Sequence, residues 1–185
     1  MIISLRGASG SGKTTLAREV MSHYARQRFR YMPGRKNPYY VVHGRDAVDA
    51  IRSSHLLVTP GHYDIGNGGV DTLRTLDEAY SIARWADNMR YDVLMEGKCM
   101  SDGTPHAAKL HEEGRDIRVV HVDTNVNTCC ESVHLRGHKI ARASIEKTNR
   151  KVLANMEQFR CMKIQTFSGS RTECLLQVRE WLVLS

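Results

Sequence analysis

Long apolar runs are missing from this sequence of 185 residues, because no stretch of about 18 consecutive apolar residues occurs in it. This excludes a membrane-spanning helix. The first strand-like run begins at residue 2, so we expect no signal peptide and a cytoplasmic protein. The five cysteines are odd in number and none are spaced as C-x-x-C, which favours reduced thiols over a disulfide framework or a zinc site. No internal repeat or low-complexity segment occurs.

Acidic residues are scarce in two stretches of a chain whose net charge is +7. Seven basic residues between positions 26 and 52 face only Asp46 and Asp49, and six between positions 136 and 151 face only Glu146. Basic clusters of this kind are typical of a polyanion-binding surface, although arginines that serve a nucleotide's own phosphates would give the same pattern. Both interpretations remain open for the first cluster, where aromatic residues are interleaved, and the second cluster favours nucleotide binding.

A glycine-rich stretch near the N-terminus carries the strongest signal in the sequence. It matches the pattern G-x-x-x-x-G-K-[ST], with Gly7, Gly12, Lys13 and Thr14 at the fixed positions. An apolar run at 2–5 precedes it and helix-spaced apolar residues follow over 16–24, so the stretch joins a strand to a helix. Such a loop points backbone N–H groups at phosphate oxygens.

The residue types of this loop predict binding of ATP and Mg²⁺. Lys13 can reach the β- and γ-phosphates, and the hydroxyl of Thr14 suits Mg²⁺. The residues expected to contact the nucleotide are Gly7, Ala8, Ser9, Gly10, Ser11, Gly12, Lys13, Thr14 and Thr15.

The rest of the chain alternates strand-like and helix-like segments, which predicts an α/β fold with a parallel sheet of about five strands and helices on both faces. We expect one domain over residues 1–185. Further strands are expected at 40–42, 55–59, 91–95, 117–122 and 163–167, and the segment 29–40 is expected to be a loop. Helices are expected at 47–51, 75–89, 107–113 and 126–133, from Ser144 onward, and after a capping box of Ser170 and Glu173.

Carboxylates follow two of the expected strands. Glu96 ends the apolar run at 91–95 and is a candidate for the Mg²⁺ shell, with an ordinary strand terminus as the alternative. The glycine-dense segment 62–71 holds Asp64 and Asp71 at the carboxyl end of another strand, where ligands bind in open α/β sheets.

These features resemble the P-loop kinases, which include nucleotide, gluconate and polynucleotide kinases. The resemblance covers the whole chain and depends on the phosphate loop, Glu96 and the break in helical pattern near Arg136. It implies a lid at about 136–143 whose arginines, Arg136 and then Arg142, contact the transferred phosphate. It also implies that residues 168–170 touch the adenine.

A narrower resemblance lies in Gly61-His62-Tyr63-Asp64 and Gly68-Gly69-Val70-Asp71, followed by Met95-Glu96-Gly97. This pattern looks like the bacteriophage kinases that phosphorylate 5-hydroxymethyluracil in DNA. It implies DNA containing a hydroxymethylated pyrimidine as the partner and, for a phage protein, the host cytoplasm as its location. These kinases often have cysteine at the position of Val70.

We therefore expect an ATP-dependent kinase acting on a hydroxyl group. Lys13 and Arg136 would stabilise the transferring phosphoryl group, and Thr14 and Glu96 would hold Mg²⁺. Asp64 is the first candidate for the base, since it follows a strand expected to lie beside the phosphate loop; Asp71 is the second, and its alternatives are orienting the substrate or capping the next helix. A small-molecule or nucleotide kinase, a polynucleotide kinase and a non-kinase P-loop switch remain alternatives.

Overall fold

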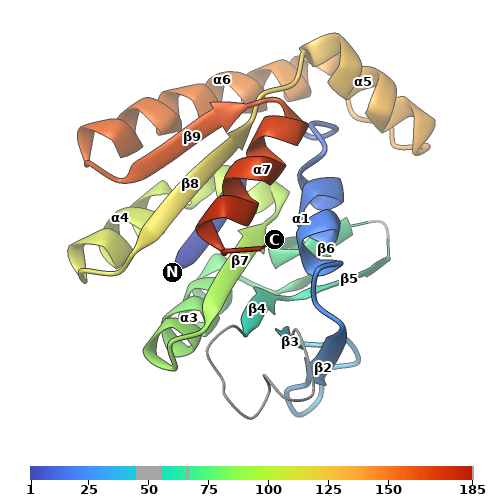
Figure 1. Cartoon of the computed structure of the whole chain (residues 1–185). Coiled ribbons are helices and arrows are strands. Elements are labelled where there is room, and N and C mark those ends of the chain that lie inside the picture. Colours follow the sequence, from blue (N-terminus) through green and yellow to red (C-terminus); the bar gives the residue numbers. More distant parts are fainter. Residues whose placement is uncertain (45–55, 66, 185) are drawn as a thin grey trace.

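The sheet at the centre of the molecule contains five parallel strands, as the alternating sequence pattern predicts. The computed structural model describes residues 1–44, 56–65 and 67–184. The order of the sheet is β2-β3-β4-β7-β1-β8-β9 (Figure 1). Its parallel strands are β4 (Leu57–Pro60), β7 (Asp92–Glu96), β1 (Ile2–Arg6), β8 (Ile117–Val122) and β9 (Gln165–Gly169).

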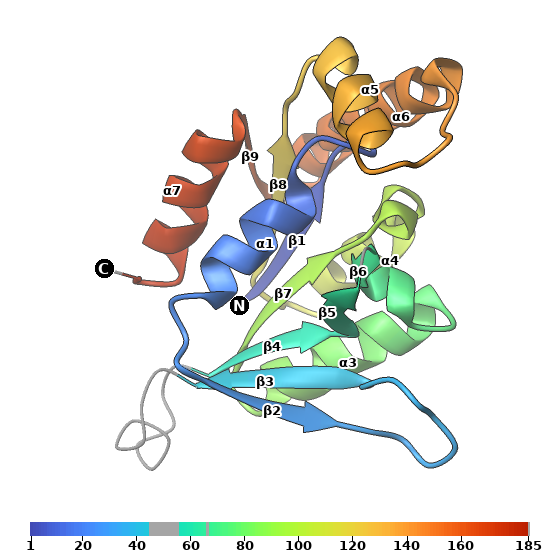
Figure 2. The same cartoon turned by 90° about the vertical axis from the view of Figure 1, so that its right-hand side faces the viewer.

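Two antiparallel strands extend one edge of this sheet. They are β2 (Arg26–Arg30) and β3 (Tyr40–Gly44), so the prediction of a loop beginning at Phe29 is wrong for its first residues. The exposure of β2 explains the error, because every one of its side chains is exposed and no apolar face marks it as a strand. Tyr40 pairs with both Arg30 and Pro60, which places the connection 31–39 at the carboxyl edge of the parallel strands (Figure 2).

Helices cover both faces of the sheet, which confirms the predicted architecture. On one face α1 (Lys13–Met21) and α7 (Arg171–Trp181) bury Leu16, Val20 and Val178 against β1 and β8. On the other face lie α3 (Leu76–Asn88), α4 (Thr104–Glu112) and α6 (Arg142–Cys161). Another helix, α5 (Val126–Leu135), packs against the N-terminal part of α6 and against Ala8 of the phosphate loop. The expected helix at 47–51 lies outside the described residues.

Helix ends agree with the sequence at two positions and differ at a third. Ser170 and Glu173 form the predicted capping box at the start of α7, and the Thr75 hydroxyl accepts a hydrogen bond from the Glu78 N–H at the start of α3. Ser144 does not cap α6, because the helix begins two residues earlier, after Ala141. Ser144 therefore lies in its first turn.

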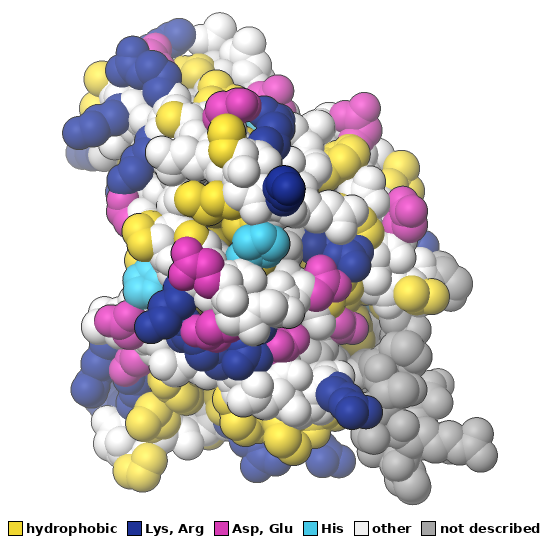
Figure 3. Space-filling view, turned by 90° about the vertical axis from the view of Figure 1, so that its left-hand side faces the viewer, with side chains coloured by type: hydrophobic (Ala, Val, Ile, Leu, Met, Phe, Trp, Pro, Cys, Tyr) yellow, Lys and Arg dark blue, Asp and Glu magenta, His cyan; other side chains and the backbone are white. Residues whose placement is uncertain are grey.

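Basic and acidic side chains alternate on the side of the molecule near α3 and α4 (Figure 3). Arg84 contacts Glu113 at 2.9 Å, and Arg115 contacts Asp87 at 2.6 Å, which joins the end of α4 to α3. Because ion pairs neutralise these arginines, this side does not account for a polyanion-binding surface. Within the described residues no helix is long and apolar enough to cross a membrane, and the cysteines at 129, 130, 161 and 174 are free thiols.

Candidate active site

The phosphate loop connects β1 to α1, as its sequence predicts. Gly10 and Gly12 have φ angles of +88° and +93°, which side chains with a Cβ rarely adopt. A Cβ on Gly10 would also lie 2.3 Å from the carbonyl oxygen of Cys129. The hydroxyl of Thr124, just after β8, donates to the carbonyl oxygen of Ser11 at 3.0 Å. Neighbouring elements therefore hold the loop in a conformation that only glycine tolerates at these positions.

Lys13 lies under this loop with its ammonium group buried. Its Nζ donates to the carbonyl oxygens of Gly7 and Ala8 at 2.9 and 2.8 Å. Burial lowers the pKa of Lys13, and the charges of Glu96 and Asp71 oppose that effect. An ammonium group has three N–H donors, so one remains for a ligand in the cavity that Lys13 lines.

Thr14 and Glu96 meet at the end of β7, where the sequence predicts a metal site. The Thr14 hydroxyl donates to Glu96 Oε1 at 3.0 Å, and the Glu96 side chain is 2% exposed. Burial raises the pKa of Glu96 to about 7, against the lowering effects of Lys13 and Thr14. A hydroxyl beside a buried carboxylate is an oxygen donor set that suits Mg²⁺, which binds one or two carboxylates together with substrate phosphates and water. These two residues therefore fit the ion.

Replacing Glu96 with glutamine is expected to stabilise the ligand-free protein at pH 8 by about 1–3 kcal/mol. The folded-state pKa of about 7 lies above the ordinary 4.5, so the folded protein keeps a proton that the unfolded chain has lost. The contribution of Glu96 to the free energy of unfolding is therefore present below pH 4.5 and is lost as the pH rises to about 7. Glutamine keeps an acceptor for Thr14 and removes the charge.

Urea unfolding of wild type and Glu96→Gln at pH 5 and pH 8 measures this effect. The gain should be larger at pH 8 than at pH 5. An equal loss of stability at both values would contradict the assignment of a destabilising buried carboxylate.

The glycine-dense segment forms a small hairpin packed against the phosphate loop. Strands β5 (His62–Ile65) and β6 (Asn67–Gly69) pair and lead into the 3₁₀ turn η1 (Val70–Thr72). Gly69 has a φ of +64°, and a Cβ there would lie 2.3 Å from the carbonyl oxygen of Glu96. A Cβ on Gly68 would lie 3.4 Å from Thr14 Cγ2. The absence of a side chain at Gly69 is thus what lets the hairpin approach β7, whereas a Cβ on Gly68 would lie 2.7 Å from Tyr63 Cδ1 within the hairpin itself.

Asp71 enters the site from this hairpin. Its Oδ2 accepts a hydrogen bond of 2.7 Å from the backbone N–H of Lys98, in the 3₁₀ turn η2 (Lys98–Asp102). Asp71 does not cap the following helix α3, whose N-cap is Thr75. Its carboxylate is therefore held at the cavity by the first residue of η2 and not by the start of α3.

Asp64 lies on β5, but its side chain is outside the described part of the structure. The reason for placing it first among candidate bases was wrong, because its preceding strand β4 pairs with β7 and not with β1. Its role as the base stays a prediction.

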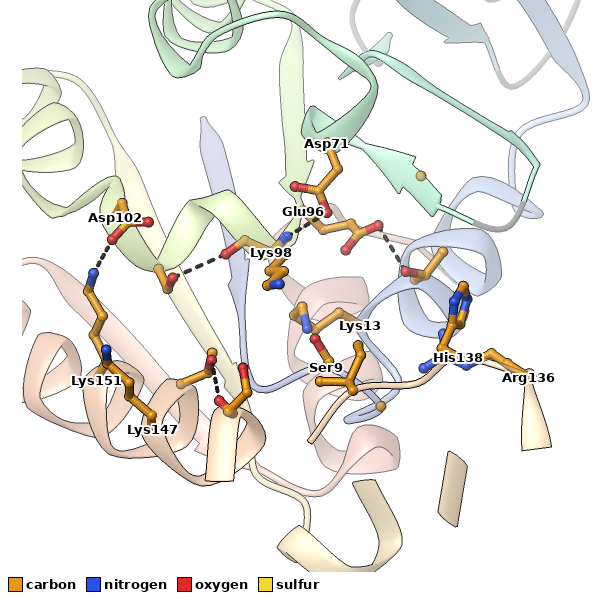
Figure 4. A pocket seen from close by; sticks show the side chains of 17 residues that line it. Ser9, Lys13, Asp71, Glu96, Lys98, Asp102, Arg136, His138, Lys147 and Lys151 are labelled. Carbon is orange, nitrogen blue, oxygen red and sulfur yellow. Dashed lines mark hydrogen bonds and ion pairs between the residues drawn. The ribbon is translucent and has the colours of Figure 1, made fainter. Parts of the chain in front are cut away.

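Two cavities meet at the phosphate loop. The first, of about 640 Å³, is named here the carboxylate cavity, since Asp71, Glu96 and Asp102 line it together with Lys98, Lys147 and Lys151 (Figure 4). The second, of about 600 Å³, is named the threonine cavity and is lined by Thr15, Thr124, Thr128 and Thr172 with Ser170 and Arg171. Both are lined by Gly10, Lys13, Thr14 and Arg136.

The structure brings together most of the predicted nucleotide-binding residues. Ser9 lines the carboxylate cavity, Ser11, Gly12 and Thr15 line the threonine cavity, and Gly7 and Ala8 contribute the carbonyl oxygens that hold Lys13. Arg136 follows α5, is exposed, and donates to the Ser132 carbonyl oxygen at 3.0 Å. Arg142 instead pairs with Glu146 at 2.8 Å and is not among the described residues that line either cavity.

Four cationic residues at the two cavities were not named as site residues from the sequence, although two of them, Lys147 and Lys151, belong to the basic cluster at 136–151. Arg171 directly follows the segment that the resemblance assigns to adenine, and its Cδ lies 3.2 Å from the position of a Cβ on Gly12. Lys147 and Lys151 are four residues apart on an expected helix, which was a readable sign of a shared face. No local sequence pattern identifies Lys98 as a residue of the cavity.

Similar proteins are kinases. The chain is 35% identical over 136 residues to the 5-hmdU DNA kinase of Pseudomonas phage PaMx11, which covers 73% of this chain and 68% of that protein. Deoxyadenosine kinase from M. mycoides has a similar fold, with TM-scores of 0.51 in two structures, one with the products dCMP and dCDP and one with dATP. These structures are 12% and 13% identical to the chain, cover 99% of it, and are themselves covered over 99% and 100% of their length.

No protein-family model matches the sequence. The phage relative is nevertheless similar over enough of both chains to define the family, and the solved structures share the P-loop kinase fold. The chain is therefore a phosphotransferase of the P-loop type and belongs to the 5-hmdU DNA kinase family.

Proposed function

We propose that this protein transfers the γ-phosphoryl group of ATP to the hydroxymethyl group of 5-hydroxymethyluracil in DNA. The observation that carries the proposal is the pair of cavities that meet at Gly10, Lys13, Thr14 and Arg136. A donor in one cavity and an acceptor in the other would meet where these residues can bind the transferring group. The named activity of the phage relative supports the choice of acceptor.

ATP would occupy the threonine cavity and the phosphate loop. The backbone N–H groups of the loop and the N-terminus of α1 face anionic oxygens there. Ser170 and Arg171, at the start of α7, would lie beside the nucleoside. Thr14 and Glu96 would hold Mg²⁺, which would supply positive charge to offset that of the phosphates when bound.

The acceptor hydroxyl would enter the carboxylate cavity and attack the γ-phosphorus in line with the leaving oxygen of ADP. A new P–O bond forms, the bond to the β-phosphate oxygen breaks, and the hydroxyl proton passes to Asp71. Of the two candidate bases, Asp71 is the one whose described position lines this cavity. Arg136, in the predicted lid at 136–143, would stabilise the transferring group together with Lys13.

A base in a stacked duplex cannot reach a phosphate at the bottom of a cavity. The acceptor nucleotide would therefore be rotated out of the helix or taken from a single strand, as in other enzymes that act on bases in DNA. Because the relative is a phage protein, we propose the host cytoplasm as the place where this reaction occurs.

The edge strand β2 is expected to contribute to DNA binding. Arg26, Arg28 and Arg30 are exposed on it, whereas Arg35 forms an ion pair with Glu78 and stacks on Tyr39, with Cζ 4.8 Å from the ring centroid. Replacing the three β2 arginines with serine should raise the KM for DNA and lower its salt dependence by about one unit for each DNA phosphate that the strand no longer binds. The KM for ATP should change little, and an equal rise for both substrates would mean that this strand is not a DNA surface.

The proposed function is tested with γ-labelled ATP. The acceptors are plain DNA, DNA containing 5-hydroxymethyluracil, free nucleosides and RNA. Label on the hydroxymethylated DNA alone is the expected result. Label on nucleosides or on DNA ends would identify a small-molecule or polynucleotide kinase, and phosphate release without any acceptor would identify an ATPase.

A further inference from the structure

The carboxylate cavity carries more positive charge than phosphoryl transfer requires. Five cationic side chains line it, and two of them, Lys13 and Arg136, also line the threonine cavity where ATP is placed. The other three, Lys98, Lys147 and Lys151, line the carboxylate cavity and are not among the described residues of the other. In Figure 4 the lysines of α6 lie on one side of Lys98, and Arg136 lies on the opposite side. These three cations therefore lie in the cavity that is proposed for the acceptor.

One face of α6 supplies most of this surface. Ser144, Lys147, Thr148 and Lys151 line the cavity at spacings of three and four residues, which places them on the same side of the helix. The helix has no acidic residue in its first turn, so the partial positive charge of its N-terminus is not offset there. The Thr148 hydroxyl already donates to the Ser144 carbonyl oxygen at 2.9 Å, so the donors of this face are the Ser144 hydroxyl and two ammonium groups, which suit an oxyanion.

Contacts with η2 fix the position of this face. Lys151 forms an ion pair with Asp102, and the Asn155 side-chain amide donates to the Ser101 carbonyl oxygen at 2.8 Å. Lys98 is fixed from the other direction, because its backbone N–H is bonded to Asp71. The ammonium groups of Lys98 and Lys147 are left without a carboxylate partner among the described residues, so Lys98 and Lys147 are cations available to a ligand.

Binding by stacking has little support in this cavity. A site that holds a nucleic acid through its bases uses aromatic rings, each contributing about 1–3 kcal/mol. Among the described residues that line the carboxylate cavity there is no Phe, Tyr or Trp. His138 is the one aromatic ring among those described residues, so the cations of the cavity offer the larger contribution to affinity, through the charged groups of the acceptor, which in a nucleotide are its phosphates.

We infer that Lys98 and Lys147, with the hydroxyl of Ser144, bind the DNA phosphodiesters next to the acceptor nucleotide. This inference depends on the proposed function for the identity of the acceptor. It makes the carboxylate cavity specific for an acceptor within a strand, because a free nucleoside has no phosphate to offer these lysines. The backbone N–H of Lys98 donates to the Asp71 carboxylate, so a phosphodiester held by the Lys98 side chain would bring its nucleotide close to Asp71, the proposed general base.

The test is a double variant, Lys98→Ser with Lys147→Ser, and a matched control that removes the same charge elsewhere, Lys109→Ser with Arg150→Ser. Both control residues are exposed and neither is among the described residues lining a cavity. Binding of a labelled single-stranded oligonucleotide containing one 5-hydroxymethyluracil is followed by fluorescence anisotropy at several salt concentrations. The slope of log K against log salt should fall by about 1.4 in the double variant, since each contact to a single strand contributes about 0.7, with affinity at least about tenfold weaker, and should change much less in the control.

Steady-state kinetics of phosphoryl transfer to three acceptors show which phosphate the lysines bind. They are the oligonucleotide, 5-hydroxymethyldeoxyuridine monophosphate and the free nucleoside. The double variant should lose most of the preference of the wild type for the oligonucleotide over the nucleoside. Equal effects of the double variant and the control on binding would overturn the inference, as would a matching rise in the KM for ATP. A wild-type preference for the monophosphate over the oligonucleotide would assign the lysines to a terminal phosphate and would also overturn it.

The two proposals fail in different ways. If the wild type transfers no label to any hydroxymethylated acceptor, the proposed function is wrong. The binding experiment still tests Lys98 and Lys147 in that case, since it needs no turnover: an unchanged salt slope overturns the inference, and a slope lowered by about 1.4 supports it.

Discussion

Replacing Lys13 with alanine is expected to lower the rate of phosphoryl transfer by about 10²–10³-fold and to leave the fold intact. The ammonium group is buried beneath the phosphate loop, where it can donate to oxygens whose negative charge grows during transfer. The fold gains little from that charge, because burial lowers the pKa of Lys13 and so disfavours its ionised form. Its contacts with Gly7 and Ala8 are made to loop carbonyl oxygens and not to the core.

Steady-state kinetics on hydroxymethylated DNA and a thermal unfolding curve measure the two halves of this expectation. Lys109→Ala is the matched control, because Lys109 is an exposed lysine on α4. It should leave both measurements unchanged. A Lys13→Ala protein that is unfolded, or one with the turnover of the wild type, would refute the role given to Lys13.

Replacing Asp71 with asparagine is expected to lower kcat by about 10²–10⁴-fold with little change in KM. Asparagine has the shape of aspartate, and its carbonyl oxygen can still accept the hydrogen bond from the Lys98 N–H that holds Asp71. The amide would then present an NH₂ group to the acceptor, where the carboxylate presented an oxygen. Binding would survive while proton transfer would be lost.

Asp64→Asn is the companion variant, because it removes the other candidate base. Its kcat should stay within a few-fold of the wild-type value if Asp71 is the base. The pair is compared with one hydroxymethylated oligonucleotide at saturating ATP. A normal kcat for Asp71→Asn with a collapsed kcat for Asp64→Asn would give the role to Asp64 and limit Asp71 to orienting the loop.

Glu96 is a buried carboxylate that lowers the free energy of unfolding of the ligand-free protein. A carboxylate that is 2% exposed and has its pKa raised to about 7 reduces the stability of the ligand-free protein near neutral pH. Groups with perturbed pKa values concentrate at functional sites, where a bound ligand of opposite charge stabilises the ionised form. This is the physical basis for expecting Glu96→Gln to be more stable and less active.

The sequence alone determined the elements whose causes are local. The glycines of the phosphate loop are required by the positive φ angles at Gly10 and Gly12, and any chain that makes this turn needs them at this spacing. The parallel strands and the helices on both faces follow from alternating apolar segments of strand and helix period. The sequence also predicts that Glu96 ends a buried strand. Because that strand, β7, pairs in parallel with β1, its carboxyl end lies beside the phosphate loop that follows β1.

Only the tertiary structure decided which side chains share the site with these elements. Asp71 reaches the carboxylate cavity because Gly69 lets a hairpin pack against β7, and no local pattern distinguishes it from Asp64. Lys98 and Lys147 are 49 residues apart and meet because α6 is bound to η2. Arg35, which the sequence groups with the other basic residues, is neutralised by Glu78 on a distant helix. Contacts between segments far apart in the chain depend on packing and strand order, and these are properties of the assembled fold and not of any one segment.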